Sequence, residues 1–464
     1  MNRHNLKHPH KELRKRLGTR FSTDDAVRDA HARDASYHQG TLPDAVAFPK
    51  TNAEVADIVR ICAKYKIPIV PYGTGTGVEG AVVATEGVLC IALNEMNRIL
   101  RVSPDDRDAT VEAGVTRLQL NTHLTKIGTQ LHFSVDPGAD ASLGGMVATR
   151  ASGTSAVRYG TMLDNVLGLT VVTADGSIVQ TGSRARKSAA GYDLTRLFIG
   201  SEGTLGIITE ITLKLTRLPD AVASAVCAFP TVAAAVDTVI KMMDTGISIA
   251  RIELLDELQM DAVNKYAGLD YEVAPTLFFE FHGSEHTVAE SSEIAGKIAA
   301  MHGSGDFRWA TDENERKRLW QARYDSYYAA LNRRPGSVGY VTDVCVPISR
   351  LAECIAKTKA LLATSYLIPS ILGHVGDGNF HVVFPLEPNN KVELAEAQRL
   401  SDQIVDIALE MDGTCTGEHG VGVGKRNALE KEHGEAIDLM RAIKHALDPQ
   451  NLMNPGKVFL SPQT

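Results

Sequence analysis

Three clusters of glycine in the first half of the chain restrict the folds that it can adopt. The first, PYGTGTGVEG at residues 71–80, directly follows the apolar run at residues 67–70. Glycine destabilises the interiors of helices and strands, so we expect this segment to be a loop that leaves a strand. A second Gly- and Ser-rich stretch covers residues 137–160, and the third, IGSEGTLG, covers residues 199–206 and precedes a strand at residues 207–215.

The run GTGVEG at residues 75–80 formally matches the dinucleotide fingerprint, but that motif needs a helix directly after it. Another strand is expected here instead, which disfavours a Rossmann fold. Consecutive backbone N–H groups in a Gly-rich turn still form a nest for anionic oxygens. Any single cluster is compatible with a plain loop, whereas three within one domain indicate a large ligand that contains a pyrophosphate.

Two histidines flank a Gly-rich turn in the second half of the chain. In ILGHVGDGNFHVV, residues 371–383, an apolar strand ends at His374 and another begins at Phe380. A hairpin would bring His374 and His381 to face each other. Glu418, in TGEHGVGVGK, is the candidate third ligand, because two His and one Glu with an open position are typical of catalytic metal sites. His419 would sit beside the metal as a proton acceptor. The alternative is that these groups pack or hydrogen-bond in ordinary loops.

Composition places the chain among soluble globular proteins. Its 464 residues allow two to three domains, and the net charge of −8 is spread over the chain, without a basic stripe for nucleic acid. Six cysteines without a CxxC pair indicate free thiols and no iron–sulfur cluster of its own. No apolar run is long enough for a membrane span, and the basic residues 1–20 lack the apolar core of a signal peptide.

Local patterns divide the chain near residues 217–221. Before this point we expect a helix at residues 54–64, strands at 67–70, 88–93 and 109–112, an amphipathic segment at 118–127, and a hairpin of residues 166–173 and 177–181. After it, strands at 223–229, 250–255 and 276–282 and a helix at 233–243 indicate an antiparallel sheet with helices on one face. Residues 427–447 are expected to form one helix, followed by an irregular tail at 448–458.

The run from PYGTGTGVEG through DPGADASLGGMVATRASGTSAVRYGTMLDNVLGL to GSEGTLGIITEITLKL resembles the FAD domain of the vanillyl-alcohol oxidase and p-cresol methylhydroxylase superfamily. The motifs HVGDGNFH, GEHGVGVGK and NPGKVF resemble its FAD-linked 2-hydroxy acid dehydrogenases, and LWQARYDSYYAAL and GYVTDVCVPISRLAECI are most similar to the D-lactate dehydrogenase (cytochrome) type. The resemblance covers about residues 10–460. It implies an α+β fold with an N-terminal helical segment (1–40), a two-part FAD-binding domain (41–219) and a substrate and metal domain (220–464) whose C-terminal segment returns to the FAD domain.

The resemblance also implies where FAD binds, with Tyr72 to Gly77 around the pyrophosphate. The implied cofactor residues are Tyr72, Gly73, Thr74, Gly75, Thr76, Gly77, Pro137, Gly138, Ser142, Gly144, Gly145, Thr149, Gly153, Thr154, Val157, Tyr159, Glu202, Gly203, Gly206, Ile207, Ile208 and Asn454. Members that attach FAD covalently often carry a His in the first glycine loop. This chain has Val78 and Glu79 there, so we expect non-covalent FAD.

The expected reaction is oxidation of a D-2-hydroxy acid, with D-lactate to pyruvate as first choice. A divalent metal, with zinc preferred over manganese or iron, would lower the pKa of the substrate hydroxyl. His419 would take its proton while the hydride passes to flavin N5. Arg323 is expected to clamp the substrate carboxylate, because a guanidinium matches it bidentately. Trp320 and Tyr327, three and four positions away, would wall the pocket or belong to the core, and Asn379 is a further substrate-binding candidate.

Val341 bears on the choice of substrate. Relatives that act on 2-hydroxyglutarate carry a Lys in the strand before the residue corresponding to Asp343, where this chain has Val341. A monocarboxylate is therefore favoured, with D-2-hydroxyglutarate dehydrogenase and the glycolate oxidase flavin subunit as alternatives. Non-redox alkyl transfer on the same fold is a remote alternative, because the His cluster of that enzyme type is missing.

The expected partners are the substrate and an electron acceptor: cytochrome c, a quinone or an electron-transfer flavoprotein. We expect no nucleic acid, a cytoplasmic location compatible with peripheral association at the inner membrane, and allow for a homodimer.

Overall fold

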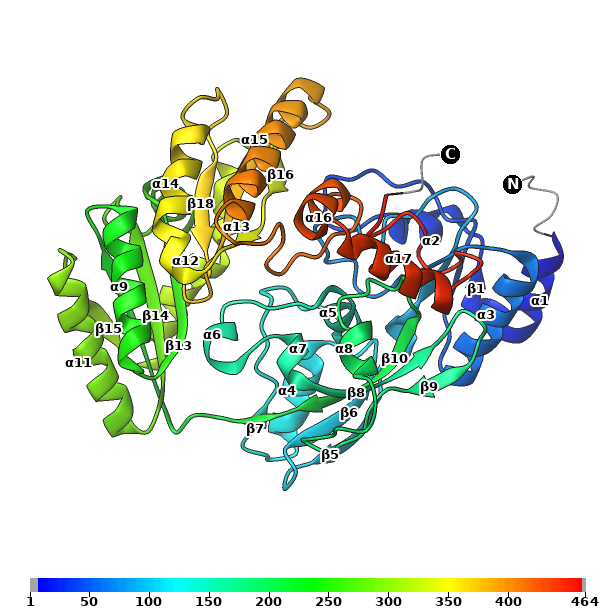
Figure 1. The fold of residues 1–464 in the computed structure, drawn as a ribbon. Coiled ribbons are helices and arrows are strands. Elements are labelled where there is room, and N and C mark those ends of the chain that lie inside the picture. Colours follow the sequence, from blue (N-terminus) through cyan, green and yellow to red (C-terminus); the bar gives the residue numbers. More distant parts are fainter. Residues whose placement is uncertain (1–6, 461–464) are drawn as a thin grey trace. The chain divides into compact units, whose positions relative to one another are not determined.

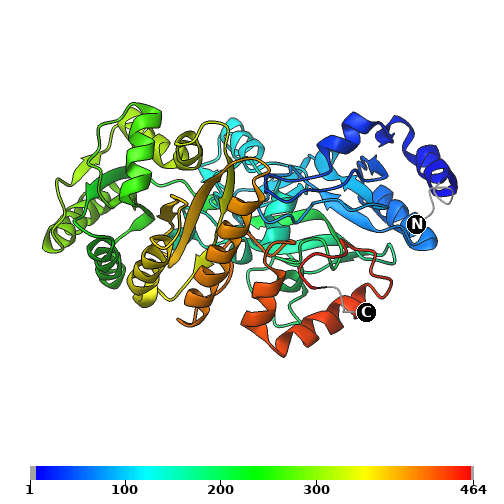
Figure 2. The same ribbon diagram turned by 90° about the horizontal axis from the view of Figure 1, so that it is seen from above.

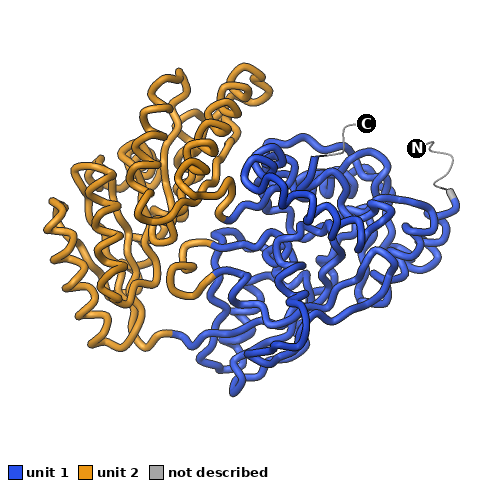
Figure 3. The backbone as a smooth tube through the Cα atoms, viewed as in Figure 1, with its two compact units in different colours: residues 1–152, 161–218, 418–464 blue, residues 153–160, 219–417 orange. Residues whose placement is uncertain are grey.

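The computed structural model describes residues 7–460. The chain forms two compact units (Figure 3). Unit 1 contains residues up to 152, residues 161–218 and residues from 418 onward, and unit 2 contains residues 153–160 and 219–417. The C-terminal segment thus returns to the first unit, and a short piece of the second glycine-rich stretch belongs to the second.

Unit 1 contains three sheets and short helices (Figure 1). Its four-stranded sheet has the order β1 (Phe21–Ser22), β2 (Ala45–Ala47), β4 (Leu89–Ala92) and β3 (Ile69–Tyr72), with β2, β4 and β3 parallel. Its five-stranded antiparallel sheet has the order β5 (Ile99–Ser103), β6 (Asp108–Glu112), β10 (Ile207–Lys214), β8 (Val166–Val172) and β9 (Ile178–Gln180). Strands β7 (Leu131–His132) and β11 (Thr216–Arg217) form a third, small sheet.

The helices of unit 1 include some from both ends of the chain, drawn blue and red in Figure 2, and others from residues 117–198. They are α1 (Lys7–Leu17), α2 (Asp25–Ala30), α3 (Asn52–Tyr65), α4 (Arg117–Lys126), α5 (Leu143–Thr149), α7 (Met162–Asn165), α8 (Leu194–Phe198), α16 (Arg426–His433) and α17 (Ala436–Leu447), with 3-10 turns η2 (Gly18–Arg20) and η3 (Leu93–Glu95).

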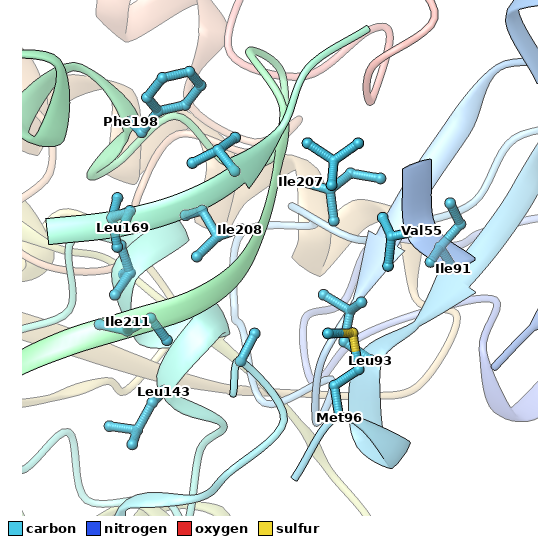
Figure 4. Close-up of a cluster of buried hydrophobic side chains, with 14 of the residues drawn as sticks. Val55, Ile91, Leu93, Met96, Leu143, Leu169, Phe198, Ile207, Ile208 and Ile211 are labelled. Atoms are coloured by element: carbon cyan, nitrogen blue, oxygen red, sulfur yellow. The ribbon is translucent and has the colours of Figure 1, made fainter. Parts of the chain in front are cut away.

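One apolar cluster joins these elements (Figure 4). Val55 of α3 and Ile91 of β4 belong to the same buried cluster as Ile207 and Ile211 of β10 and Leu143 of α5. Every second side chain of β10 is fully buried: Ile207, Thr209, Ile211 and Leu213. This alternation is typical of a strand with one face towards the core. The helix expected at residues 54–64 is confirmed as α3, capped by Thr51, whose hydroxyl accepts from the Glu54 backbone N–H.

Unit 2 is built on one antiparallel sheet. The strands follow the order β15 (Arg308–Ala310), β12 (Ala221–Ala228), β14 (Thr276–Gly283), β13 (Ile249–Leu255), β18 (Ser370–Gly373), β19 (Asn379–Leu386) and β16 (Val338–Val341), with β17 (Val344–Cys345) also paired to β19. Its helices are α6 (Ala156–Tyr159), α9 (Val232–Thr245), α10 (Glu257–Ala267), α11 (Glu285–Met301), α12 (Glu313–Tyr324), α13 (Ser326–Asn332), α14 (Leu351–Leu362) and α15 (Lys391–Leu409), with the 3-10 turn η4 (Ile348–Arg350).

Helices cover both faces of this sheet, and not one face as the sequence suggested. Phe278 of β14 shares a buried cluster with Trp320 of α12 and with residues of α10 and α13. The next residue, Phe279, points to the other face and contacts Phe307, which also lies against Gly296 of α11. The expected α+β class itself is confirmed.

The prediction of one continuous helix at residues 427–447 is wrong. This segment breaks into α16 and α17 at Gly434, which has a φ of +50°. Glycine adopts this left-handed backbone conformation at little cost, so the chain changes direction there. The tail expected at residues 448–458 is indeed irregular, and Met453 forms an isolated bridge to Ile69 of β3. Among residues 7–460, no helix combines the length and apolar character needed to cross a bilayer.

Candidate active site

The first glycine cluster lines a cavity within unit 1. Residues 73–77 leave β3 without a following helix, as expected. Two adjoining cavities share Gly73, Gly145 and Thr149. Together they are lined by fifteen of the expected cofactor residues: Tyr72, Gly73, Thr74, Gly75, Thr76, Gly77, Pro137, Ser142, Gly144, Gly145, Thr149, Glu202, Gly203, Gly206 and Ile208.

Glycine is needed in this wall because of close approaches. Gly75 has a φ of +68°, and a Cβ there would lie 2.1 Å from the Tyr72 hydroxyl oxygen. A Cβ at Gly73 would lie 2.3 Å from Ser142 Oγ. Without these side chains the backbone of the loop can face a bound molecule directly, which suits an anionic pyrophosphate. The cradle therefore fits a dinucleotide.

Four expected cofactor residues belong to unit 2 instead: Gly153, Thr154, Val157 and Tyr159. Their segment is tied to the sheet of unit 2. The Tyr159 hydroxyl lies 2.6 Å from His282 Nδ1, and His282 Nε2 lies 2.8 Å from Glu280 Oε1. A Cβ at Gly376, in the turn between the two histidines, would lie 2.8 Å from Val157.

Glu202 and Asn454 hold the returning C-terminal segment in unit 1. The Glu202 carboxylate accepts from the backbone N–H groups of Val421 (2.7 Å) and Gly422 (2.8 Å). Asn454 donates to the carbonyls of Ala81 (2.9 Å) and Glu202 (2.6 Å). Burial raises the pKa of Glu202 to about 7, against the lowering effect of these two N–H donors and of Lys457.

The segment held in this way carries Glu418 and His419, which line the same cavity as the first glycine loop. His419 Nδ1 lies 3.9 Å from Glu79 Oε1, and its Nε2 lies 3.9 Å from Glu418 Oε1. Glu79 is buried and its Oε1 lies 3.2 Å from Lys425 Nζ. The expected proton acceptor is thus flanked by two carboxylates at the edge of the glycine-lined cavity.

The two histidines of unit 2 face each other across a hairpin, as expected. His381 follows the start of β19 opposite Leu372 of β18, and His374 comes directly after β18. Their ring centroids are 5.3 Å apart and the rings are nearly perpendicular. His381 Nδ1 lies 3.1 Å from the Thr342 carbonyl oxygen, and His374 Nδ1 lies 2.7 Å from Glu253 Oε1.

These contacts fix the tautomer of both rings. A carbonyl and a carboxylate only accept hydrogen bonds, so each Nδ1 carries a proton, and in the neutral form of each ring Nε2 then carries the lone pair. Metal-ligating histidines commonly donate their second N–H to such acceptors. The pair is therefore suited to ligate a metal through Nε2.

Glu253 is a functional candidate that the sequence analysis missed. It lies in β13, is fully buried, and accepts from Arg323 Nε at 2.8 Å and Nη2 at 2.7 Å as well as from His374. Arg323, expected to clamp a substrate, thus directs two of its nitrogens at a protein carboxylate. A substrate carboxylate would have to use the remaining N–H groups of Nη1 and Nη2.

Asn379 and Asp343 organise the turn beside His381. Asn379 Nδ2 donates to Asp343 Oδ1 (2.7 Å) and to the Val344 carbonyl (2.8 Å), while its buried Oδ1 accepts no hydrogen bond from the described residues. Thr416 donates to Asp343 Oδ2 at 2.8 Å. A Cβ at Gly417 would lie 2.3 Å from Asn379 Nδ2, so the chain passes close to this group just before Glu418.

Trp320 and Tyr327 lie among apolar residues of unit 2. Trp320 is 5% exposed, and its Nε1 donates to Ser224 Oγ at 3.0 Å. Tyr327 lies on α13, beyond the end of α12 at Tyr324, and packs partly buried against the same cluster. Trp320 is therefore a core residue in this structure and does not wall a pocket.

Comparison with known proteins identifies the family. Residues 43–182 match the family described as an FAD binding domain, and residues 218–458 match the C-terminal domain of FAD linked oxidases. The chain is 52% identical to the probable mitochondrial D-lactate dehydrogenase of Danio rerio, covering 96% of this chain and 90% of that protein. It is 48% identical to the mitochondrial D-lactate dehydrogenase [cytochrome] of Arabidopsis thaliana, covering 97% and 79%.

A solved structure of p-cresol methylhydroxylase with substrate bound has the same fold, with a TM-score of 0.82, 19% identity, and coverage of 99% of this chain and 98% of that one. At this identity the likeness shows the fold alone. The resemblance drawn from the motifs is confirmed, and FAD is the cofactor of the matched domain.

The raised pKa of Glu202 predicts a pH-dependent contribution to stability. The folded state holds this proton up to about pH 7, whereas an ordinary Glu loses it near 4.5. Its contribution to the free energy of unfolding is therefore fully present below pH 4.5 and falls, by up to about 3 kcal/mol, as pH rises through 7. Glu202→Gln removes this titration, so the urea midpoint of wild type should fall relative to that of the variant from pH 5 to pH 8. An equal difference at both pH values would contradict the assignment.

Proposed function

The chain belongs to the family of FAD-linked oxidases, and on this premise we propose that it oxidises D-lactate to pyruvate. The observation that carries the proposal is the histidine pair of unit 2, with both Nδ1 protons held by acceptors, in a chain whose relatives are named D-lactate dehydrogenases. This pairing suits a site that binds and polarises a 2-hydroxy acid.

We propose that His374, His381 and Glu418 hold a divalent metal. Support comes from the tautomer of each histidine and from the chain path, since Glu418 directly follows Gly417, which lies beside Asn379. Two imidazoles and one carboxylate suit zinc first and also manganese or iron. When bound, the cation would supply Lewis-acid polarisation of the substrate hydroxyl, and FAD would supply the acceptor for two electrons.

The residues of this chain would bind the substrate and move its proton. Arg323 would receive the substrate carboxylate on the remaining N–H groups of Nη1 and Nη2, with its orientation set by the pair of hydrogen bonds to Glu253. The buried Oδ1 of Asn379 can accept from a substrate hydroxyl. His419 would take the hydroxyl proton, and Glu79 would stabilise the imidazolium that results. Tyr327 would wall the substrate pocket, whereas Trp320 belongs to the buried cluster of unit 2.

Val341 favours a monocarboxylate. This residue lies in β16 and packs against the buried cluster of unit 2, so it offers no charge for a second carboxylate. D-2-Hydroxyglutarate and glycolate remain the alternative substrates. Non-redox alkyl transfer remains a remote alternative reaction.

For partners we propose a carrier that accepts electrons from the reduced flavin: cytochrome c, a quinone or an electron-transfer flavoprotein. The relative from Arabidopsis is named for a cytochrome. We also propose that FAD is bound non-covalently, that the protein forms a homodimer, and that it is cytoplasmic and peripheral at the inner membrane. The two relatives named above are mitochondrial.

The direct test of this function is anaerobic bleaching of the flavin absorbance. D-Lactate, L-lactate, glycolate and D-2-hydroxyglutarate are added to the purified protein in separate cuvettes. We expect fast bleaching by D-lactate and none by L-lactate, because the hydride must face the flavin from one side. Bleaching by the dicarboxylate alone would show that Val341 does not set the substrate, and no bleaching by any acid would refute the proposal.

His419→Ala should slow flavin reduction by D-lactate about 100- to 10,000-fold, the usual contribution of a general base. The flavin absorbance of the purified variant should stay, because the glycine loops are unchanged. His445→Ala, an exposed histidine of α17, is the matched control and should reduce its flavin at the wild-type rate. A His419→Ala protein with the wild-type rate would exclude His419 as the base.

A further inference from the structure

The N-terminal segment contributes a carboxylate to the cavity of unit 1. Asp34 lies before residue 43, where the match to the FAD binding domain begins. It nevertheless lines the same cavity as Gly75, Gly77 and His419. No glycine cluster or motif singled it out in the sequence.

Backbone hydrogen bonds tie this segment to the first glycine loop. The Ala35 N–H donates to the Gly77 carbonyl at 3.0 Å. The Tyr72 hydroxyl donates to the carbonyl oxygen of Arg33 at 3.0 Å. A Cβ built at Gly77 would lie 3.5 Å from Asp34 Oδ2. The carboxylate therefore has a fixed place beside the loop.

The two oxygens of this carboxylate have different surroundings. Oδ1 accepts from the Ser36 backbone N–H at 3.1 Å and from Ser36 Oγ at 2.5 Å. Oδ2 is buried and accepts no hydrogen bond from the described residues, and Asp34 as a whole is only 8% exposed. A buried carboxylate oxygen without a donor costs free energy, so such groups are usually satisfied by a ligand or water.

Two basic side chains, Lys457 and His38, interact electrostatically with Asp34. Lys457 is buried and donates to the Val83 carbonyl at 2.8 Å. Burial lowers the pKa of Lys457 to about 8, while the negative charges of Glu202 and Asp34 raise it. Burial also lowers the pKa of His38, and the charge of Asp34 opposes that shift.

We propose that Asp34 Oδ2 accepts a hydrogen bond from a hydroxyl or amino group of FAD. A carboxylate repels the pyrophosphate and the flavin carbonyls, and the donors of FAD are the ribityl and ribose hydroxyls, the adenine amino group and the flavin N3–H. Hydroxyls flank the pyrophosphate on both sides, which is where a residue beside Gly77 would meet them if residues 73–77 hold the pyrophosphate. This inference rests on the FAD site assigned above, and not on the substrate.

The test measures release of FAD from the holoenzyme. Flavin fluorescence is followed after dilution of wild type, Asp34→Asn and Asp34→Ala. Because hydrogen bonds to charged groups contribute strongly to binding, we expect the dissociation constant to rise about 10- to 100-fold in both variants. Asp29→Asn, an exposed aspartate of α2 in the same segment, is the control and should bind FAD like wild type.

Ser36→Ala provides a milder variant if Asp34 substitutions prevent folding. It removes one of the two hydrogen bonds that hold Oδ1 but keeps the carboxylate, so FAD should bind about threefold more weakly, since the carboxylate is oriented less firmly. Competition by ADP and by FMN then distinguishes the two halves of the cofactor. Weaker competition by ADP in the Asp34 variants would assign the adenosine half, and weaker competition by FMN would assign the ribityl hydroxyls.

Unchanged FAD affinity in the Asp34 and Ser36 variants would overturn the inference and leave the proposed D-lactate oxidation intact. Conversely, a wild-type protein that binds FAD but is bleached by no hydroxy acid would refute the proposed function and leave the role of Asp34 standing.

Discussion

The buried carboxylate of Glu253 is the interaction on which the second unit depends most. It lies in the middle of the sheet and is shared by a guanidinium and an imidazole. Removing one member of such a group leaves a buried charge uncompensated, which costs about 3 to 5 kcal/mol. The strand β13, helix α12 and the hairpin of β18 and β19 are therefore held in one arrangement by a single side chain.

The same carboxylate has a chemical consequence. By accepting the Nδ1 proton of His374 it sets the tautomer, and the Thr342 carbonyl does the same for His381. In the neutral form of each ring, Nε2 then carries the lone pair that can ligate a metal. Arg323 is oriented by the same contacts, so the groups for metal and substrate would be organised before either is bound.

In unit 1, close backbone packing and hydrogen bonds to the backbone hold the elements around the cavity in place. Gly144 of α5 approaches Ala113 so closely that a Cβ there would lie 2.7 Å from the Ala113 side chain. Glu202 and Asn454 fasten the returning segment with four hydrogen bonds. The position of His419 thus depends on Glu202, more than 200 positions earlier in the sequence, and on Asn454, which follows it.

Local patterns predicted much of this architecture. The His hairpin and the glycine loops follow from turn chemistry, because glycine is required where backbones approach or φ is positive, and the motifs that carry the family resemblance lie in these same segments. Glu253 could not be predicted in this way, since its partners His374 and Arg323 are 121 and 70 positions away and a single Glu in an apolar strand has no local signature. Asp34 could not be predicted for the same reason, and the assignment of residues 153–160 to unit 2 depends on contacts with His282 and Gly376.

Metal analysis tests most directly whether Glu253 prepares the proposed metal site. Wild type loaded with zinc and dialysed should retain about one metal per chain, and Glu253→Gln should bind zinc about 10- to 100-fold more weakly, as is usual when such a partner of a ligating histidine is lost. Equal zinc affinity in wild type and variant, or no retained metal in wild type, would contradict the account.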